Sequence, residues 1–155
     1  MRIYIVRHGE ARIDSAGERA LSEHGFEQAR AAGAVLAKEG VDQLLYSPKL
    51  RTRQTAAEIA RVCGGLPSRE AACLLPPAAI EEVVASVEGS AVQSLGLVSH
   101  LPWVAEMVAW FVNGDMRDFR LPGFPTSGVV ALDMDIVGRG TAQLAWHAFP
   151  PDYGQ

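Results

Sequence analysis

The apolar run Ile3–Val6 is followed at once by Arg7, His8, Gly9 and Glu10. The run is long enough for a buried strand and too short for most helices. Residues that follow a strand of an open α/β sheet lie at the edge where such sheets bind ligands. Gly9 has no side chain, so a ligand could approach the backbone closely there. The feature predicts a strand that delivers Arg7 and His8 to a site; the alternative is a surface turn with two incidental cations.

A second junction of the same kind follows residues 41–46, which predict another strand. Ser47 then resembles a helix cap and Pro48 a first-turn residue, so a helix is expected up to the glycine pair at 64–65. Arg51 falls in the first turn of this helix, where a cation is unfavourably placed relative to the helix dipole. An anionic ligand beside Arg51 explains that position, whereas Arg53 fits an exposed helix face.

A third junction follows residues 95–98 (Leu-Gly-Leu-Val), a run typical of a buried strand. His100 comes directly after it, and Pro102 marks the first turn of a helix that is expected to end near residue 112. Arg7, His8, Arg51 and His100 are therefore all expected at the carboxyl edge of one parallel sheet.

The rest of the chain completes an α/β order. We expect a loop over residues 11–20, a helix between Ser22 and Gly40, a loop with a weak strand over 66–75, a helix over 78–87 closed by Gly89, an irregular segment over 113–126, and an antiparallel pair formed by 127–133 and 141–147. Together these elements predict one domain over residues 1–155. Its fold class is α/β, with a three-layer α/β/α arrangement, a mostly parallel central sheet, helices on both faces and an antiparallel edge.

Composition narrows the class of protein. The 155 residues carry 14 basic and 18 acidic side chains, a formal charge of −4, which argues against general binding to nucleic acid or to a membrane surface. No segment approaches the roughly 20 apolar residues that a membrane span needs, and no secretory signal is visible. Cys63 and Cys73 have neither metal-ligand nor disulfide spacing, so we expect reduced thiols in a cytoplasmic protein.

Two arginines and two histidines at one sheet edge suggest phosphoryl chemistry. Guanidinium groups match phosphate oxygens in a bidentate manner, and a neutral imidazole is a competent nucleophile near pH 7. No cluster of carboxylates accompanies the histidines, and the arginines would repel a cation, so no metal or other cofactor is expected. The pattern predicts phosphoryl transfer through a phosphohistidine intermediate.

Three blocks of this sequence resemble the histidine phosphatase superfamily, which includes the phosphoglycerate-mutase-like enzymes. They are residues 7–10 (Arg-His-Gly-Glu), residues 47–55 (Ser-Pro-Lys-Leu-Arg-Thr-Arg-Gln-Thr) and residues 97–102 (Leu-Val-Ser-His-Leu-Pro). The blocks occur in the family's order and span the chain.

The short length, the His-Leu-Pro form of the third block and residues 125–128 (Pro-Thr-Ser-Gly) are similar to the small SixA-type branch, the bacterial phosphohistidine phosphatases. That resemblance implies His8 as the nucleophile, with Arg7, Arg51 and His100 holding the phosphoryl oxygens. Arg51, rather than Arg53, matches the family position.

One departure from the family concerns the proton donor. Larger relatives carry an acidic residue between the second and third blocks, whereas residues 73–77 of this chain read Cys-Leu-Leu-Pro-Pro. Glu81 and Glu82 follow, but their helical context predicts a solvated face. An alkoxide leaving group needs a proton donor, and an imidazole leaving group needs far less help. The missing carboxylate therefore favours a substrate with a phosphorus–nitrogen bond, such as phosphohistidine, over a sugar phosphate.

Several other residues have two interpretations. Ser127 is expected either to offer its hydroxyl or backbone N–H to the phosphate or simply to start a strand, and Glu10 either to orient the site or to carry a proton. His24 is expected in solvent and His147 in a structural position. Trp103 follows His100 closely and either lines the pocket or belongs to the core.

Three functions stay open at this point. The first is a phosphatase whose partner is a phosphorylated protein, a small helical phosphotransfer domain of a phosphorelay. The second keeps the chemistry but acts on a small phosphorylated metabolite, and the third is an inactive phosphate-binding module. The sequence leaves the oligomeric state undetermined.

Overall fold

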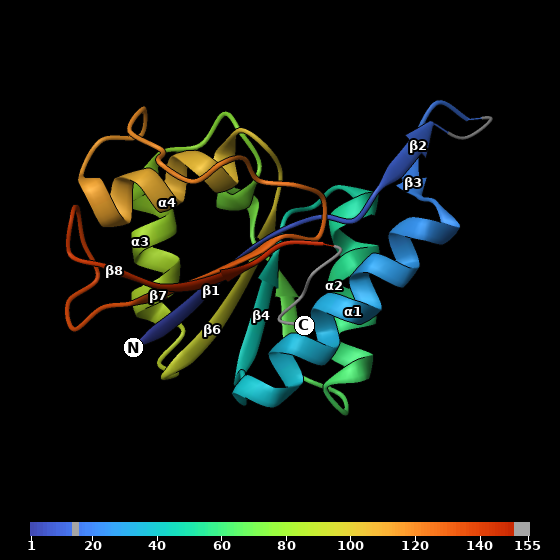
Figure 1. Cartoon of the computed structure of the whole chain (residues 1–155), viewed down its shortest axis with the longest axis horizontal. Coiled ribbons are helices and arrows are strands. Elements are labelled where there is room, and N and C mark those ends of the chain that lie inside the picture. Colours follow the sequence, from blue (N-terminus) through green and yellow to red (C-terminus); the bar gives the residue numbers. More distant parts are fainter. Residues whose placement is uncertain (14–15, 151–155) are drawn as a thin grey trace.

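The computed structural model describes residues 1–13 and 16–150. A six-stranded sheet in the order β5-β4-β6-β1-β7-β8 forms its centre (Figure 1). The first four of these strands are parallel to one another, and β7 and β8 are antiparallel at one side. The predicted fold class, a mostly parallel sheet with an antiparallel edge, is confirmed.

The elements have the following bounds. The strands of the sheet are β1 (Arg2–Arg7), β4 (Gln43–Tyr46), β5 (Ser68–Glu70), β6 (Ser94–Ser99), β7 (Val129–Asp133) and β8 (Gln143–Ala148). The helices are α1 (Glu23–Glu39), α2 (Leu50–Val62), the 3₁₀ helix η1 (Ala72–Leu74), α3 (Ile80–Gly89) and α4 (Trp103–Asn113). A separate hairpin consists of β2 (Ala11–Ile13) and β3 (Arg19–Leu21).

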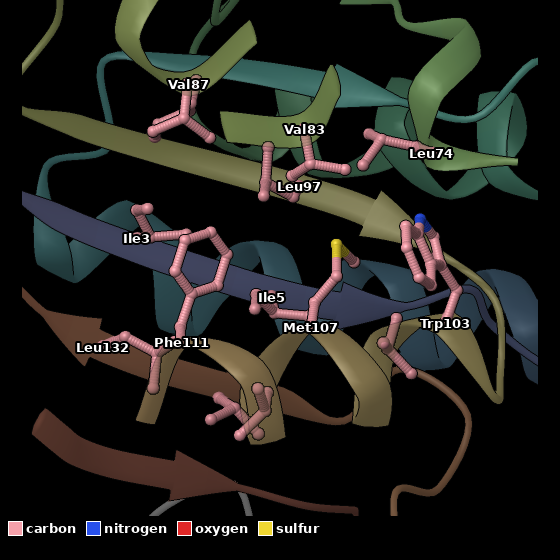
Figure 2. Packing of buried hydrophobic residues seen from close by; sticks show 14 of the residues in the cluster. Ile3, Ile5, Leu74, Val83, Val87, Leu97, Trp103, Met107, Phe111 and Leu132 are labelled. Carbon is pink, nitrogen blue, oxygen red and sulfur yellow. The ribbon is translucent and has the colours of Figure 1, made fainter. Parts of the chain in front are cut away.

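The centre of the sheet is buried on both faces because the inner positions of β1, β4 and β6 carry no charged side chain. In β1, Ile3 and Ile5 pack with α3 and α4, whereas Tyr4 and Val6 face α1 and α2, as the two-residue period of a strand requires. Figure 2 shows the first of these two layers, where Phe111 of α4 lies over β1. The helices on both faces complete the predicted three layers. No helix within residues 1–13 and 16–150 is long and apolar enough to span a bilayer.

Helix boundaries follow local chemistry in most places. The side chain of Ser22 accepts a hydrogen bond from the backbone N–H of Gly25 and so caps α1, and Gly40 ends this helix in the left-handed region at φ 71°. The prediction for Ser47 is wrong: α2 is preceded by Lys49, and no side chain caps it. The hydroxyl of Ser47 makes a long-range hydrogen bond instead, described below.

One further prediction needs correction. Residues 11–20 do not form only a loop, because part of this segment pairs as the β2–β3 hairpin. Cys63 lies at the end of α2 and Cys73 lies in η1, shortly after β5; both are free thiols.

The segment after β1 is fixed by contact between two backbones. A Cβ atom added to Gly25 would lie 2.0 Å from the carbonyl oxygen of Glu10, and one added to Gly9 would lie 2.6 Å from the carbonyl oxygen of Gly25. The same Glu10 carbonyl accepts the backbone N–H of Ser22 at 3.0 Å. The first turn of α1 therefore packs directly on the residues that follow His8.

We expect Gly25→Ala to destabilise the protein by about 1–3 kcal/mol, because the added methyl group must push against backbone. Displacement of Glu10 would also disturb the adjacent site, so turnover should fall with stability. Urea unfolding followed by circular dichroism measures the effect. The matched control is Gly89→Ala at the end of α3, where an added Cβ meets nothing within 4 Å. Equal stability of the two variants would contradict the prediction.

Candidate active site

The parallel register of β1 and β6 brings two histidines side by side. Arg7 pairs with Ser99 at the carboxyl ends of these strands, so His8 and His100 are the next residues on neighbouring chains. The backbone N–H of His8 donates to the carbonyl of Ser99 at 3.0 Å. The two imidazole centroids are 5.5 Å apart. The structure thus unites the residues predicted from the first and third blocks.

The segment before β7 closes the same edge, since β7 runs antiparallel to β1. The backbone N–H of Ser127 donates to the carbonyls of both Arg7 and His8 at 2.9 Å, and Arg7 N–H donates to the carbonyl of Gly128. Because that N–H already has two backbone acceptors, the hydroxyl is the group of Ser127 better placed for the predicted phosphate contact. Ser127 is buried and has a φ of 58°, a strained backbone conformation for a residue other than glycine. A phosphate contact from its hydroxyl stays a prediction.

The imidazole of His8 is held in one tautomer. Its Nδ1 lies 2.7 Å from the carbonyl oxygen of Gly9. A carbonyl oxygen only accepts, so Nδ1 must carry the hydrogen and Nε2 keeps its lone pair. Burial, followed by the charges of Arg51 and Arg7, lowers the pKa of His8 to about 4, while the bond to Gly9 partly opposes this. At neutral pH the ring is uncharged and its Nε2 is available as a nucleophile.

The imidazole of His100 is held from its other nitrogen. Nε2 lies 2.7 Å from the hydroxyl oxygen of Ser47, which is fully buried. Nδ1 is also buried and has no hydrogen-bond partner among the described residues. Burial, with the charges of Arg51 and other nearby groups, lowers the pKa of His100 to about 3. A neutral ring whose Nδ1 lacks a partner can take a hydrogen bond from, or donate one to, a bound group.

Two guanidinium groups face this edge from β1 and from α2. Arg7 uses one amino nitrogen to donate to the carbonyl of Phe124 at 2.9 Å. The Nε atoms of Arg7 and Arg51 are buried without a partner among the described residues. Burial, and next the charge of Arg19, lowers the pKa of both arginines, whose guanidinium groups nevertheless stay charged at neutral pH. Partly buried cations with unused donors form a site for an anion.

Helix α2 is tied to this edge by a threonine. The hydroxyl of Thr55 accepts the backbone N–H of Gly9 at 3.0 Å and donates to the carbonyl of Arg51 at 2.7 Å. One side chain therefore connects the residue after His8 with the turn that carries Arg51. Ser47 and Thr55 lie at the two ends of the second block, but their function depends on partners distant in sequence. Local patterns therefore missed both.

The carboxylate of Glu10 has two partners, at the start of α1 and on the hairpin. Its carboxylate accepts the Ser22 hydroxyl at 2.9 Å and pairs with Arg12 at 3.4 Å. The Ser22 hydrogen bond is the largest influence and, with Arg12, lowers the pKa of this exposed carboxyl. Glu10 is thus an ionised group at the start of α1, a geometry that suits orientation of the loop after His8. A proton-carrying function stays a prediction.

The segment expected to lack a carboxylate, residues 73–77, lies beside Trp103 and Ser99. The indole N–H of Trp103 donates to the carbonyl of Cys73 at 3.0 Å, and the Ser99 hydroxyl donates to the carbonyl of Leu74. Trp103 is buried and belongs to the core, which decides between its two interpretations (Figure 2). Hydrogen bonds to its own backbone carbonyls therefore hold this segment against Trp103 and Ser99.

The remaining acidic and histidine candidates are exposed. Glu81 and Glu82 lie on the solvated side of α3, and His24 is exposed in α1, as predicted. His147 is exposed on β8 with its ring 4.7 Å from that of Phe149, which is a packing contact. Within residues 1–13 and 16–150, no three His, Cys, Asp or Glu side chains are grouped as metal ligands.

The architecture and the site define a class, an α/β protein with an anion pocket built around a neutral histidine. The histidine phosphatase superfamily (branch 1) matches residues 3–74 of the chain. Phosphohistidine phosphatase SixA of Escherichia coli K12 is 31% identical over 159 residues, covering 97% of this chain and 94% of that protein. The chain belongs to the histidine phosphatase superfamily.

Solved structures agree with this assignment. The protein histidine phosphatase SixA complexed with tungstate has a TM-score of 0.79 at 29% identity, covering 95% of this chain and 96% of that chain. A putative SixA from Agrobacterium tumefaciens has a TM-score of 0.77 at 27% identity. The similarity to the probable phosphoglycerate mutase GpmB of Photorhabdus laumondii is narrower, with 37% identity over 70 residues and 41% of this chain.

We expect Ser47→Ala to lower kcat/KM roughly tenfold. The substitution leaves Nε2 of His100 buried without its partner, and an unsatisfied buried polar group costs about 1–3 kcal/mol. Steady-state kinetics with p-nitrophenyl phosphate, and NMR of the His100 ring, measure the effect on rate and on ring protonation. Ser90→Ala is the control, since that hydroxyl only donates to the Val87 carbonyl in α3. If both variants retain full activity and unchanged imidazole signals, Ser47 does not position His100.

The pH dependence follows from the lowered pKa of His8, about 4. The neutral, nucleophilic form should stay dominant as the pH falls from 7 to 5, whereas an imidazole with the ordinary value of about 6.5 would be mostly protonated at pH 5. We therefore expect protonation of His8 to lower kcat/KM, corrected for ionisation of the substrate, only near pH 4. NMR titration of the His8 ring gives the direct value, and a midpoint near 6.5 would contradict the prediction.

Proposed function

We propose that this protein is a metal-independent phosphatase that forms a phosphohistidine intermediate on His8 and removes phosphate from phosphohistidine of a signalling protein. The observation that carries the proposal is the His8 ring, whose Nδ1 is fixed by the Gly9 carbonyl and whose Nε2 is uncharged beside Arg7, Arg51 and His100. The similarity to SixA proteins over nearly the whole chain supports the substrate class. Tungstate, present in one of these structures, is a tetrahedral oxyanion like phosphate.

The first step transfers the phosphoryl group. Nε2 of His8 attacks phosphorus, a new P–N bond forms, and the P–N bond to the substrate imidazole breaks. The leaving imidazole takes the electron pair and a proton from solvent. Arg7 and Arg51 neutralise the phosphoryl oxygens, and the unpartnered Nδ1 of His100 contacts one of them.

The second step hydrolyses the intermediate. Water attacks phosphorus, the P–N bond to His8 breaks, and the electron pair returns to Nε2. Inorganic phosphate leaves, with the proton from water going to the released phosphate or to solvent. Because Nδ1 donates to Gly9 throughout, His8 regains its starting tautomer without rotating its ring.

The chemistry of the leaving group favours phosphohistidine over a phosphomonoester. The charged groups with the largest effects on His8 and His100 are cations, and residues 73–77 supply no carboxylate. Without a carboxylic acid from this segment, expulsion of an alkoxide is slower, because general acid assistance is typically worth about 10²–10⁴-fold. An imidazole leaves without that assistance because it is protonated readily near neutral pH.

A phosphatase of small phosphomonoesters is the alternative. It is supported by the similarity of part of the chain to probable phosphoglycerate mutases. An inactive binding module is disfavoured because the nucleophile is neutral and positioned.

The test compares phosphate release from a phosphorylated histidine phosphotransfer domain, from p-nitrophenyl phosphate and from a panel of sugar phosphates. We expect the first to have the highest kcat/KM, and His8→Ala to lower all measurable turnover by about 10³-fold or more. His24→Ala, at an exposed position on α1, is the matched control and should retain activity. Activity should persist after treatment with a chelator, and quenching in alkaline denaturant should trap a base-stable, acid-labile phosphate that His8→Ala lacks.

Faster turnover of a sugar phosphate than of phosphohistidine would move the assignment to the small-metabolite alternative. Turnover unaffected by His8→Ala would remove the proposed mechanism altogether.

A further inference from the structure

A second pocket adjoins the phosphoryl site and shares Arg51 with it. Its volume is about 440 Å³, and it lies between the segment that leads into β3 and the start of α2. Its lining residues are Ala16, Gly17, Glu18, Arg19, Lys49, Leu50 and Arg51. None of these residues except Arg51 is needed for the phosphoryl chemistry described above.

The pocket is predominantly cationic. Arg19, Lys49 and Arg51 contribute three positive charges, and Glu18 contributes one negative charge. Within residues 1–13 and 16–150, no carboxylate oxygen lies within ion-pairing distance of the three cations, and Arg19 makes one long hydrogen bond, 3.5 Å, to the carbonyl of Ala11. The charge of Arg19 lowers the pKa of His8, and those of Lys49 and Arg19 lower the pKa of His100, so both cations act on the phosphoryl site. An anion bound here would relieve this repulsion.

The pocket wall that carries Arg19 is attached to the scaffold. The side-chain carbonyl of Gln54, in α2, accepts the backbone N–H of Leu21 in β3 at 2.8 Å. Strand β3 is therefore fixed to the helix that carries Lys49 and Arg51. The β2–β3 hairpin rises beside the carboxyl edge of the sheet (Figure 1). The backbone of the strand that carries the exposed Arg19 side chain is thus attached beside α2.

We propose that this pocket is a second anion subsite, which binds an acidic side chain of the protein substrate close to its phosphohistidine. The inference rests on the proposed function and adds the source of substrate selectivity. A net charge of about two positive units, after Glu18 is counted, suits a carboxylate of single charge. Ile13, whose side chain is 72% exposed, pairs with Arg19 across the hairpin, and Leu101, 45% exposed, directly follows His100. A protein can cover such apolar side chains when it binds, and a small metabolite cannot cover both.

The experiment uses the full chain and a phosphorylated histidine phosphotransfer domain as the probe. We expect the Arg19→Gln/Lys49→Gln variant to reduce kcat/KM for this domain, mainly through KM, by about 3–10-fold more than it reduces kcat/KM for p-nitrophenyl phosphate, since two solvent-accessible charge contacts with the protein substrate are lost. The matched control, Arg53→Gln/Arg69→Gln, removes the same charge from exposed positions outside the pocket. It should leave the ratio of the two kcat/KM values unchanged.

A second arm changes the probe. Replacing the surface carboxylates around the phosphohistidine of the phosphotransfer domain by amides should weaken turnover by the wild type and have a smaller effect on the pocket variant, because a contact already lost cannot be lost again. Additive effects, or an equal response of the pocket variant and the Arg53/Arg69 control, would overturn the subsite. If the wild type does not dephosphorylate the domain at all, the proposed function fails first, and p-nitrophenyl phosphate turnover shows whether the phosphatase chemistry survives.

Discussion

The position of β1 between β6 and β7 is the constraint on which the site depends. The parallel pairing with β6 places His8 next to His100, and the antiparallel pairing with β7 brings Ser127 onto the carbonyls of Arg7 and His8. A shift of one residue in either pairing would turn each β1 side chain to the opposite face, so that Tyr4 and Val6 would enter the layer that Ile3 and Ile5 fill. The continuous apolar sequence of β1, buried on both faces, therefore fixes the chemistry at its carboxyl end. The side chains of residues 3–6 thus stabilise the core and also position the residues that follow them at the site.

Burial explains why the histidines are neutral and the arginines are poised for an anion. Two imidazoles and two guanidinium groups share a small volume, so their charges repel and protonation of either ring is unfavourable. The protein stabilises this arrangement with neutral partners, namely the Gly9 carbonyl, the Phe124 carbonyl and the Ser47 hydroxyl. A carboxylate in their place would raise the imidazole pKa values and compete with phosphate for the arginines. The neutral surroundings keep His8 nucleophilic and leave the cationic donors to the substrate.

Much of this could be predicted from the sequence, because the relevant signals are local. Strands β1, β4 and β6 contain short apolar runs, and Arg7, His8, Arg51 and His100 each stand at the end of such a run or shortly after it. Ser47 shows the limit, since a serine before proline has the local signature of a cap, whereas its true partner is 53 residues away.

The hairpin is a second limit to sequence-based prediction. Strands β2 and β3 have three residues each and lie outside the central sheet, so they lack the apolar alternation that identifies a strand. Their position depends instead on tertiary contacts, including the bond from Leu21 to Gln54. Contacts between residues so far apart in sequence cannot be predicted from local sequence patterns.

The site suits a phosphoryl transfer in which one P–N bond is broken and another P–N bond is formed. Transfer from a phosphorylated imidazole to His8 exchanges one P–N bond for another, so the step has little intrinsic thermodynamic demand and needs positioning more than acid catalysis. A site of this kind requires fixed tautomers and oriented cations, which the backbone of Gly9 and the arginines provide. Selectivity among phosphorylated proteins must then come from outside the reacting atoms. The cations that flank Arg51, on the hairpin and just before α2, lie where they can bind a second group of the substrate beside the reacting phosphoryl group.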